Sequence, residues 1–175
     1  MKFLVRRFGN RFGTYTDERG GIWFEIVSPQ NEYFGFSVFN NRSNKAYDSG
    51  FHYGFVNLDR PYFIDVSSRE IYSETFYPKI AYAHLFKMSV DEANTVYHDM
   101  WLNLRNYANL GEDLTDVAYA RYERYISNRL KELGYDSIIF VRNIYDEVLF
   151  NSKSYDNFVQ DHVFYVGNDI DWFTW

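Results

Sequence analysis

The fold of this chain is decided by residues 129–150, RLKELGYDSIIFVRNIYDEVLF. Leucines at helical spacing end at Gly134, the residue type expected just past a helix C-terminus, where a positive φ is needed. The run SIIFV at 137–141 is rich in β-branched and aromatic residues and predicts a well-buried strand. A short hairpin connection and a second strand at 148–150 are expected to follow. Glu147 stands at the mouth of that hairpin beside apolar residues, which makes it a candidate for chemistry.

Two helices are expected upstream of the strand at 137–141. Ser89 is followed three residues later by Glu92, a capping box that satisfies two backbone donors at a helix N-terminus. From there an apolar stripe at three- to four-residue spacing continues to Leu104. The second helix is expected at 114–133, directly before the glycine turn.

The remaining chain has the composition of strands and turns. The pair of strands expected at 51–56 and 62–66 flanks a turn at 57–61. Strands, then helices, then strands again indicate an α+β fold in one domain that spans residues 1–175. We expect two small packed sheets, mostly antiparallel, with helices flanking one side and a cleft between the sheets. The other expected strands are 3–8, 22–27, 79–88 and 163–166, the last of which closes the chain.

Composition excludes several classes of site. The chain has no cysteine, which rules out disulfide frameworks, thiol nucleophiles and zinc–cysteine sites and fits a reducing, cytoplasmic compartment. Its four histidines are not spaced as metal ligands, so no metal is expected. A net charge of −6 argues against nonspecific binding to a phosphate backbone. Aromatic residues make up 22% of the chain, and two interpretations stay open for them: core packing, or a cleft for a planar ligand.

Few residues remain as candidates for chemistry. No nucleophile motif and no phosphate-binding loop is present. Side chains adjacent on a strand point to opposite faces, so only one of Asp146 and Glu147 faces a cleft. The same alternation holds for Arg6 and Arg7 on the first strand. The other candidates are Trp23, Phe24 and Tyr33.

Five blocks of this sequence resemble, in order, the ADP-ribosyltransferase superfamily, in particular the small single-domain members found in phages and mobile elements. The resemblance implies a split β-sheet sandwich with flanking helices and a central cleft. It also implies NAD as a substrate, no metal, and transfer of one ADP-ribose to a host protein or nucleic acid in the host cytoplasm. The blocks are LVRRFG at 4–9, GGIWFE at 20–25, NEYFG at 31–35, DRPYFIDV at 59–66 and LKELGYDSIIFVRNIYDEVLF at 130–150.

The same resemblance implies roles for individual residues. Glu147 is expected to be the catalytic acid, with a solvated strand charge as the alternative. One of Arg6 and Arg7 is expected to contact the phosphate and ribose of NAD, and we favour Arg7. At most one of the two aromatic residues on the second strand is expected to line the cleft, since core packing is the commoner fate of such side chains. The full set of expected cofactor contacts is Arg6, Arg7, Trp23, Phe24 and Tyr33, and for Tyr33 two roles stay open: stacking on nicotinamide, or packing in the core.

Two positions depart from the pattern of the superfamily. Ser137 replaces the usual glycine of the last block, which is a mild change. Arginine-modifying members carry Glu or Gln two residues before the catalytic acid, and Tyr145 occupies that position here. We therefore expect an acceptor other than arginine, which Tyr145 would contact; the alternative is that Tyr145 only packs in the hairpin. Tyr135 and Asp136, by contrast, follow a helix end and are expected to form a structural turn in which Asp136 caps backbone donors.

Two other functions stay open at this stage. A catalytically inactive relative would act as a binding protein or inhibitor of a host defence protein, which suits a small, acidic, aromatic-rich chain. Hydrolysis of NAD without transfer is the third possibility.

Overall fold

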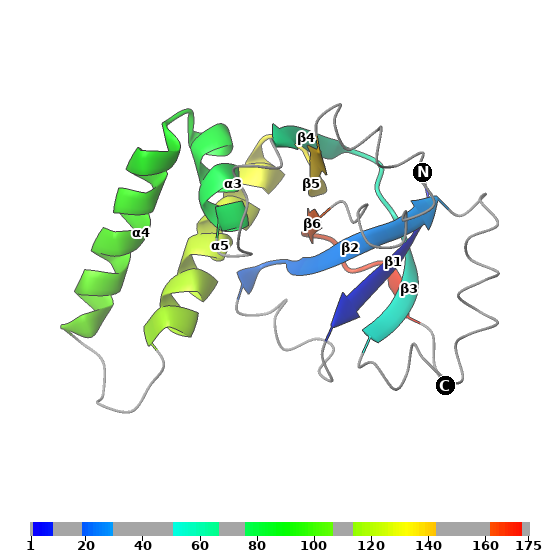
Figure 1. Cartoon of the computed structure of the whole chain (residues 1–175), viewed down its shortest axis with the longest axis horizontal. Helices are drawn as coiled ribbons and strands as arrows, with labels where there is room; N and C mark the ends of the chain where they lie inside the picture. The colour runs from blue at the N-terminus through cyan, green and yellow to red at the C-terminus, as the bar shows by residue number, and fades with distance from the viewer. Residues whose placement is uncertain are drawn as a thin grey trace.

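The computed structural model describes residues 2–8, 19–29, 51–66, 76–106, 114–142 and 162–172. These residues form three helices and seven strands (Figure 1). The helices gather at one end of the molecule and the strands at the other, with α4 farthest from the sheet. In chain order the elements are β1 (Lys2–Phe8), β2 (Ile22–Pro29), β3 (Phe51–Asn57), β4 (Pro61–Val66), α3 (Phe76–Phe86), α4 (Val90–Arg105), α5 (Leu114–Glu132), β5 (Ser137–Arg142), β6 (His162–Tyr165) and β7 (Ile170–Trp172).

The described strands belong to one sheet in the order β4-β5-β6-β2-β1-β3-β7. β4 and β5 run parallel, and the other neighbours are antiparallel. The strands predicted around residues 57–61 are confirmed, but β3 and β4 do not pair with each other. The strand predicted at 163–166 is confirmed as β6, whereas the prediction that it closes the chain is wrong because β7 follows it. The strand predicted at 148–150 lies outside the described residues.

The sheet is strongly bent. Only residues 58–60 connect β3 to β4, although β5, β6, β2 and β1 lie between them in the sheet. Five strand-to-strand steps would span ~24 Å in a flat sheet, whereas four Cα steps of an extended chain reach about 14 Å. The sheet therefore curls until its two halves pack against each other. Two separate packed sheets were expected, and the finding corrects this: the two halves belong to one hydrogen-bonded sheet.

Each face of the sheet has its own core. On the concave face, side chains from both halves of the sheet meet, and Leu58 in the β3–β4 connection packs among them with 3% of its surface exposed. On the opposite face, which we call the helix face, the helices cover β4, β5 and β6. The concave core consists of Val5, Ile22, Phe24, Ile26, Val56, Leu58, Ile139, Val163 and Tyr165. The sheet residues in the helix-face core are Ile64, Val66, Ile138, Phe140 and Phe164.

The strand predicted at 79–88 is wrong, because Phe76–Phe86 is the helix α3. This helix is apolar on nearly every side, with Ile80, Ala81, Ala83 and Leu85 all buried between the sheet and the other helices. A short, continuously apolar run does not distinguish a buried strand from a buried helix. The signals for a helix were the alanines, which have the highest helix propensity, and a proline in the first turn.

The other two helices follow their sequence signals. Ser89 accepts a hydrogen bond from the backbone N–H of Glu92, and the Glu92 carboxylate accepts one from the backbone N–H of Ser89, which confirms the predicted capping box. α5 ends at Glu132, and Gly134 follows with φ +85°, as expected for a residue just past a helix end. No helix in the described part of the chain is long and apolar enough to cross a membrane.

Candidate functional site

Four polar side chains from the neighbouring strands β6, β2, β1 and β3 lie on the helix face of the sheet, where the helical cover ends at β6. We call Tyr53, Arg6, Glu25 and His162 the polar row. The register places Tyr53 opposite Arg6, Arg6 opposite Glu25, and Glu25 opposite His162. Residues directly opposite each other on paired strands point to the same face, so the four side chains share one face.

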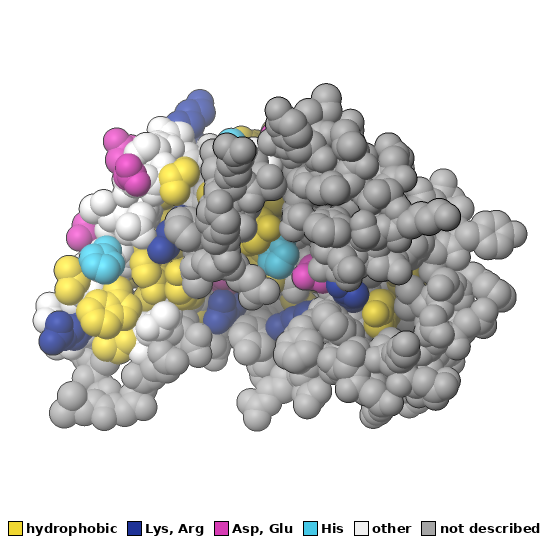
Figure 2. Space-filling view, viewed as in Figure 1, with side chains coloured by type: hydrophobic (Ala, Val, Ile, Leu, Met, Phe, Trp, Pro, Cys, Tyr) yellow, Lys and Arg dark blue, Asp and Glu magenta, His cyan; other side chains and the backbone are white. Residues whose placement is uncertain are grey.

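An ion pair fixes the centre of the polar row. Arg6 Nε donates to Glu25 Oε2 at 2.9 Å, and the two side chains are 21% and 24% exposed. The guanidinium is thus oriented by a partner on the neighbouring strand while its charge stays close to solvent. Figure 2 shows acidic, basic and histidine side chains next to one another in the middle of this view.

Aromatic rings border the row on its helical side, and we call Trp23, Tyr77, Phe140, His162 and Phe164 the aromatic wall. His162 belongs to both groups. The Tyr77 ring of α3 stacks on His162 with a centroid distance of 4.3 Å and an interplanar angle of 16°. Trp23 lies 5.5 Å from His162 and 4.8 Å from Phe164, measured between ring centroids. Tyr77, Phe140 and Phe164 are buried, so Trp23 and His162, which are partly exposed, are the rings of the wall that a planar ligand could contact.

The Trp23 ring is held from α5. Its Nε1 donates to Glu123 Oε1 at 2.8 Å, and Arg19 Nη1 donates to the other oxygen, Oε2, also at 2.8 Å. Glu123 is 2% exposed, so its carboxylate is buried with these two donors. A buried carboxylate that is hydrogen-bonded on both oxygens holds its donors in place, since losing either donor leaves a buried negative charge without a partner, which is destabilising.

The structure divides the predicted site residues between the two faces of the sheet. Arg6 and Trp23 lie on the helix face, in the polar row and the aromatic wall. Arg7 lies on the concave face, opposite His52 of β3. Phe24 also lies there and is 2% exposed in the core. One surface of the sheet therefore does not carry all four residues.

Three predicted site residues, Glu147, Tyr33 and Tyr145, lie outside the described residues. β5 ends at Arg142, five residues before Glu147, and β6 begins at His162 in the polar row.

The predicted structural turn at Tyr135 and Asp136 is confirmed. Asp136 Oδ2 accepts from the backbone N–H of Asp59 at 2.8 Å, and Asp136 Oδ1 accepts from Ser137 Oγ at 2.8 Å. Ser137, at the position where the superfamily has glycine, is fully buried. The turn thus ties the start of β5 to the β3–β4 connection.

Sequence reasoning missed four residues of this region. The faces of Glu25 and His162 were predictable, because side chains alternate along a strand and these residues lie two positions from Trp23 and Phe164. That the two residues lie opposite each other was not predictable, because it depends on the register of the sheet. Tyr77 was missed because the run that contains α3 was interpreted as a strand. Glu123 is one of three acidic residues on α5, and nothing in the neighbouring sequence indicates its contact with Trp23.

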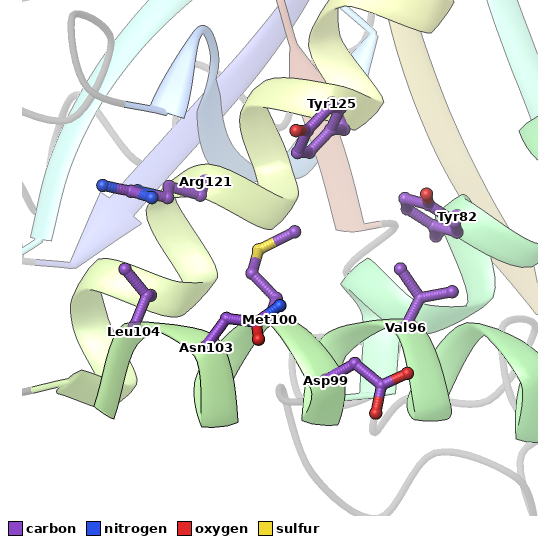
Figure 3. Close-up of a pocket in the computed structure, with 8 residues that line it drawn as sticks. All are labelled: Tyr82, Val96, Asp99, Met100, Asn103, Leu104, Arg121 and Tyr125. Carbon is purple, nitrogen blue, oxygen red and sulfur yellow. The ribbon is translucent and has the colours of Figure 1, made fainter. Parts of the chain in front are cut away.

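A hollow lies between α4 and α5, away from the polar row (Figure 3). It has a volume of about 700 Å³, and the Met100 side chain extends into it between Arg121 and Tyr125. Tyr125 is 54% exposed at its rim. The lining residues are Tyr82, Val96, Asp99, Met100, Asn103, Leu104, Arg121 and Tyr125.

Within the described ranges, no group of three His, Asp or Glu side chains is placed to hold a metal ion. The chain was also compared with protein-family models, with curated proteins and with solved structures, and none of them matches.

Proposed function

We propose that this chain is a NAD-dependent mono-ADP-ribosyltransferase that modifies a host macromolecule. One observation carries the proposal. Arg6 and Trp23 come from two separate blocks of the sequence resemblance, and they lie on one face of the sheet, with Trp23 next to His162 and Arg6 two strands from it. Glu147 lies outside the described residues, and His162 is the first described residue after it in the chain.

The chemistry of NAD fits such a surface. Its pyrophosphate is an anion that a guanidinium binds with charge-assisted hydrogen bonds, and Arg6 is the arginine that lies on the same face as the aromatic wall. Its nicotinamide and adenine rings are planar groups that stack on side chains such as Trp23. We therefore assign the phosphate contact to Arg6 rather than to Arg7, whose neighbours are on the concave face.

Glu147 is the proposed catalytic acid. Transfer breaks the bond between the nicotinamide nitrogen and C1′ of the ribose, and the electron pair leaves with neutral nicotinamide. The sugar then carries oxocarbenium character until a nucleophile of the acceptor attacks C1′ and loses its proton. A carboxylate that accepts a hydrogen bond from the ribose hydroxyl stabilises this positive charge more in the transition state than in the ground state. The same reasoning applies to glycoside cleavage.

The experiment that tests the proposal is Glu147→Gln, which retains the shape of the side chain and removes its charge. We expect transfer of label from NAD to host lysate to fall by about 10²-fold or more. Glu132→Gln is the matched control, because that glutamate is exposed on α5 and pairs with Arg129 one turn away. Equal transfer by the Glu147 variant and the wild type would refute the catalytic role.

Binding of NAD separates this proposal from the inactive alternative. A ligand at 100 times its dissociation constant stabilises the folded state by about 2.7 kcal/mol. No thermal shift at millimolar NAD would favour a binding protein, for which the hollow between α4 and α5 with the exposed Tyr125 is the surface to test. Free ADP-ribose as the sole product would indicate hydrolysis instead of transfer.

A further inference from the structure

We propose that Glu123 is a positioning residue for NAD binding: it acts from the helical layer and sets the orientation of the Trp23 ring. This inference rests on the proposed function, because it concerns the same surface. Glu123 does not belong to any block of the sequence resemblance, and it lies 100 residues from Trp23 in the chain.

Two side chains of α5 hold the start of β2. Glu123 binds Trp23 through one oxygen and Arg19 through the other, so its carboxylate bridges both sides of the turn at Gly20 and Gly21. Ser127, one helical turn further along α5, donates to the carbonyl of Gly20 at 2.6 Å. Both contacts come from buried side chains of α5. The helix therefore fixes where β2 enters the sheet.

β2 contributes one residue to the aromatic wall and one to the polar row. Trp23 and Glu25 are two residues apart and share the helix face. Glu25 in turn orients the Arg6 guanidinium at 2.9 Å. The orientation of the ring and the position of the arginine thus depend on one strand whose entry is held by Glu123.

The orientation of the Trp23 ring depends on its hydrogen bond to Glu123. It is partly exposed, unlike the buried Phe24 beside it, and its face meets His162 at 5.5 Å. The Nε1–H bond to Glu123 is the polar contact that selects one orientation of the indole among those the ring contacts allow. A ligand that stacks on this ring binds best when the ring is already in place, since preorganisation removes an ordering cost from binding.

The test uses the full chain and two variants of Glu123. Glu123→Leu removes both acceptor oxygens, whereas Glu123→Gln retains an acceptor for the indole and loses the charge that faces Arg19. Ser127→Ala is the matched control, because it loosens the same turn from the same helix without contacting Trp23. The indole N–H resonance of Trp23, identified by its absence in Trp23→Phe, reports the hydrogen bond without any ligand.

We expect Glu123→Leu to move the Trp23 indole resonance and to weaken NAD binding about tenfold, with the rate of nicotinamide release at saturating NAD within about twofold of wild type. Glu123→Gln is expected to weaken binding about threefold, because it retains an acceptor for the indole and loses the charge that faces Arg19. Ser127→Ala is expected to weaken binding less than either Glu123 variant, because the Ser127 hydroxyl bonds to the Gly20 carbonyl and not to the indole. Should the leucine variant fail to fold, a loss of affinity of about threefold in Glu123→Gln with a shifted indole resonance supports the same conclusion.

Wild-type affinity in a variant whose indole resonance has moved would overturn the inference. An equal loss of affinity in Ser127→Ala would overturn it as well, because the effect would then be general loosening of the turn. If the wild type binds no NAD while its Trp23 resonance still depends on Glu123, the proposed function fails and the inference falls with it. That outcome is distinguishable, because it appears before any variant is titrated with NAD.

Discussion

Replacing Gly20 with alanine measures how tightly the turn before β2 packs against α5, and Gly134→Ala is its natural control. Both glycines have positive φ, +74° and +85°. A side chain there costs about 1–2 kcal/mol, of which ~0.4–1 kcal/mol is offset by the lower entropy of the unfolded alanine chain. At Gly134 a Cβ meets nothing within 4 Å, so we expect a loss of about 1 kcal/mol in the free energy of unfolding.

At Gly20 the same Cβ would lie 2.7 Å from Ser127 Oγ and 2.9 Å from Ser127 Cβ. Ser127 is fully buried, and its hydroxyl is held by the Gly20 carbonyl, so rotating it away breaks that hydrogen bond. Overpacking of this kind adds about 1–3 kcal/mol. We therefore expect Gly20→Ala to lose about 2 kcal/mol more than Gly134→Ala.

Equilibrium unfolding in urea, followed by circular dichroism and by tryptophan fluorescence, gives both losses. At an m value of about 2 kcal/mol/M, the difference is a midpoint shift of about 1 M. A second background, Ser127→Gly, removes both close atoms and should reduce the cost of Gly20→Ala toward the Gly134 value. Equal losses at the two glycines in the wild-type background would refute the packing of this turn on α5.

Three further outcomes are expected. Tyr122→Phe should cost about 1–2 kcal/mol, because its buried hydroxyl donates to the Ala93 carbonyl at 2.7 Å, whereas Tyr125→Phe at an exposed site should cost less than ~0.5 kcal/mol in the same urea assay. Burial raises the pKa of Tyr122 and of Tyr82 above the ordinary tyrosine value, so the folded state keeps both neutral. Their contribution to stability is then present below about pH 10 and is lost as the pH rises above it, where the unfolded chain ionises first. Absorbance of tyrosinate that rises together with the loss of circular dichroism checks this, and ionisation of every tyrosine in a fully folded chain would contradict it. Transfer should avoid arginine, because Tyr145 offers a phenol where a guanidinium needs a carboxylate or amide; mass spectrometry of modified lysate proteins decides it, and a majority of modified arginines would be the opposite result.

Signals that act within one turn or one strand were predictable from the sequence. The capping box of Ser89 and Glu92 is a contact over three residues, and the positive φ of Gly134 follows from the end of a helical stripe. The alternation of Arg6 and Arg7 is also local, and the two arginines do lie on opposite faces. Each of these features depends on neighbouring residues alone.

Features that depend on tertiary packing were not predictable. α3 is surrounded by the sheet and two helices, so it lacks the polar face that would have marked a helix. The ion pair of Arg6 and Glu25 joins residues 19 apart, and it depends on a register with a shift between Leu4 and Val5. The hydrophobic pattern of β1 or β2 alone does not predict that register. The register is fixed only when the two strands pair and bury the side chains on their concave face.

The position of the candidate site follows from where the helical cover of the sheet ends. One line of directly opposed residues crosses five strands on the helix face, from Ile64 through Phe140, His162 and Glu25 to Arg6. Ile64 and Phe140 are apolar and buried under the helices, and the last two residues of the line carry charges. His162 lies between the buried apolar residues and the charged ones, and its ring stacks on Tyr77 of α3. A surface that passes from aromatic to charged within two strands, or about 10 Å, suits a ligand that has a flat ring at one end and an anion next to it. This is the physical reason for testing NAD first.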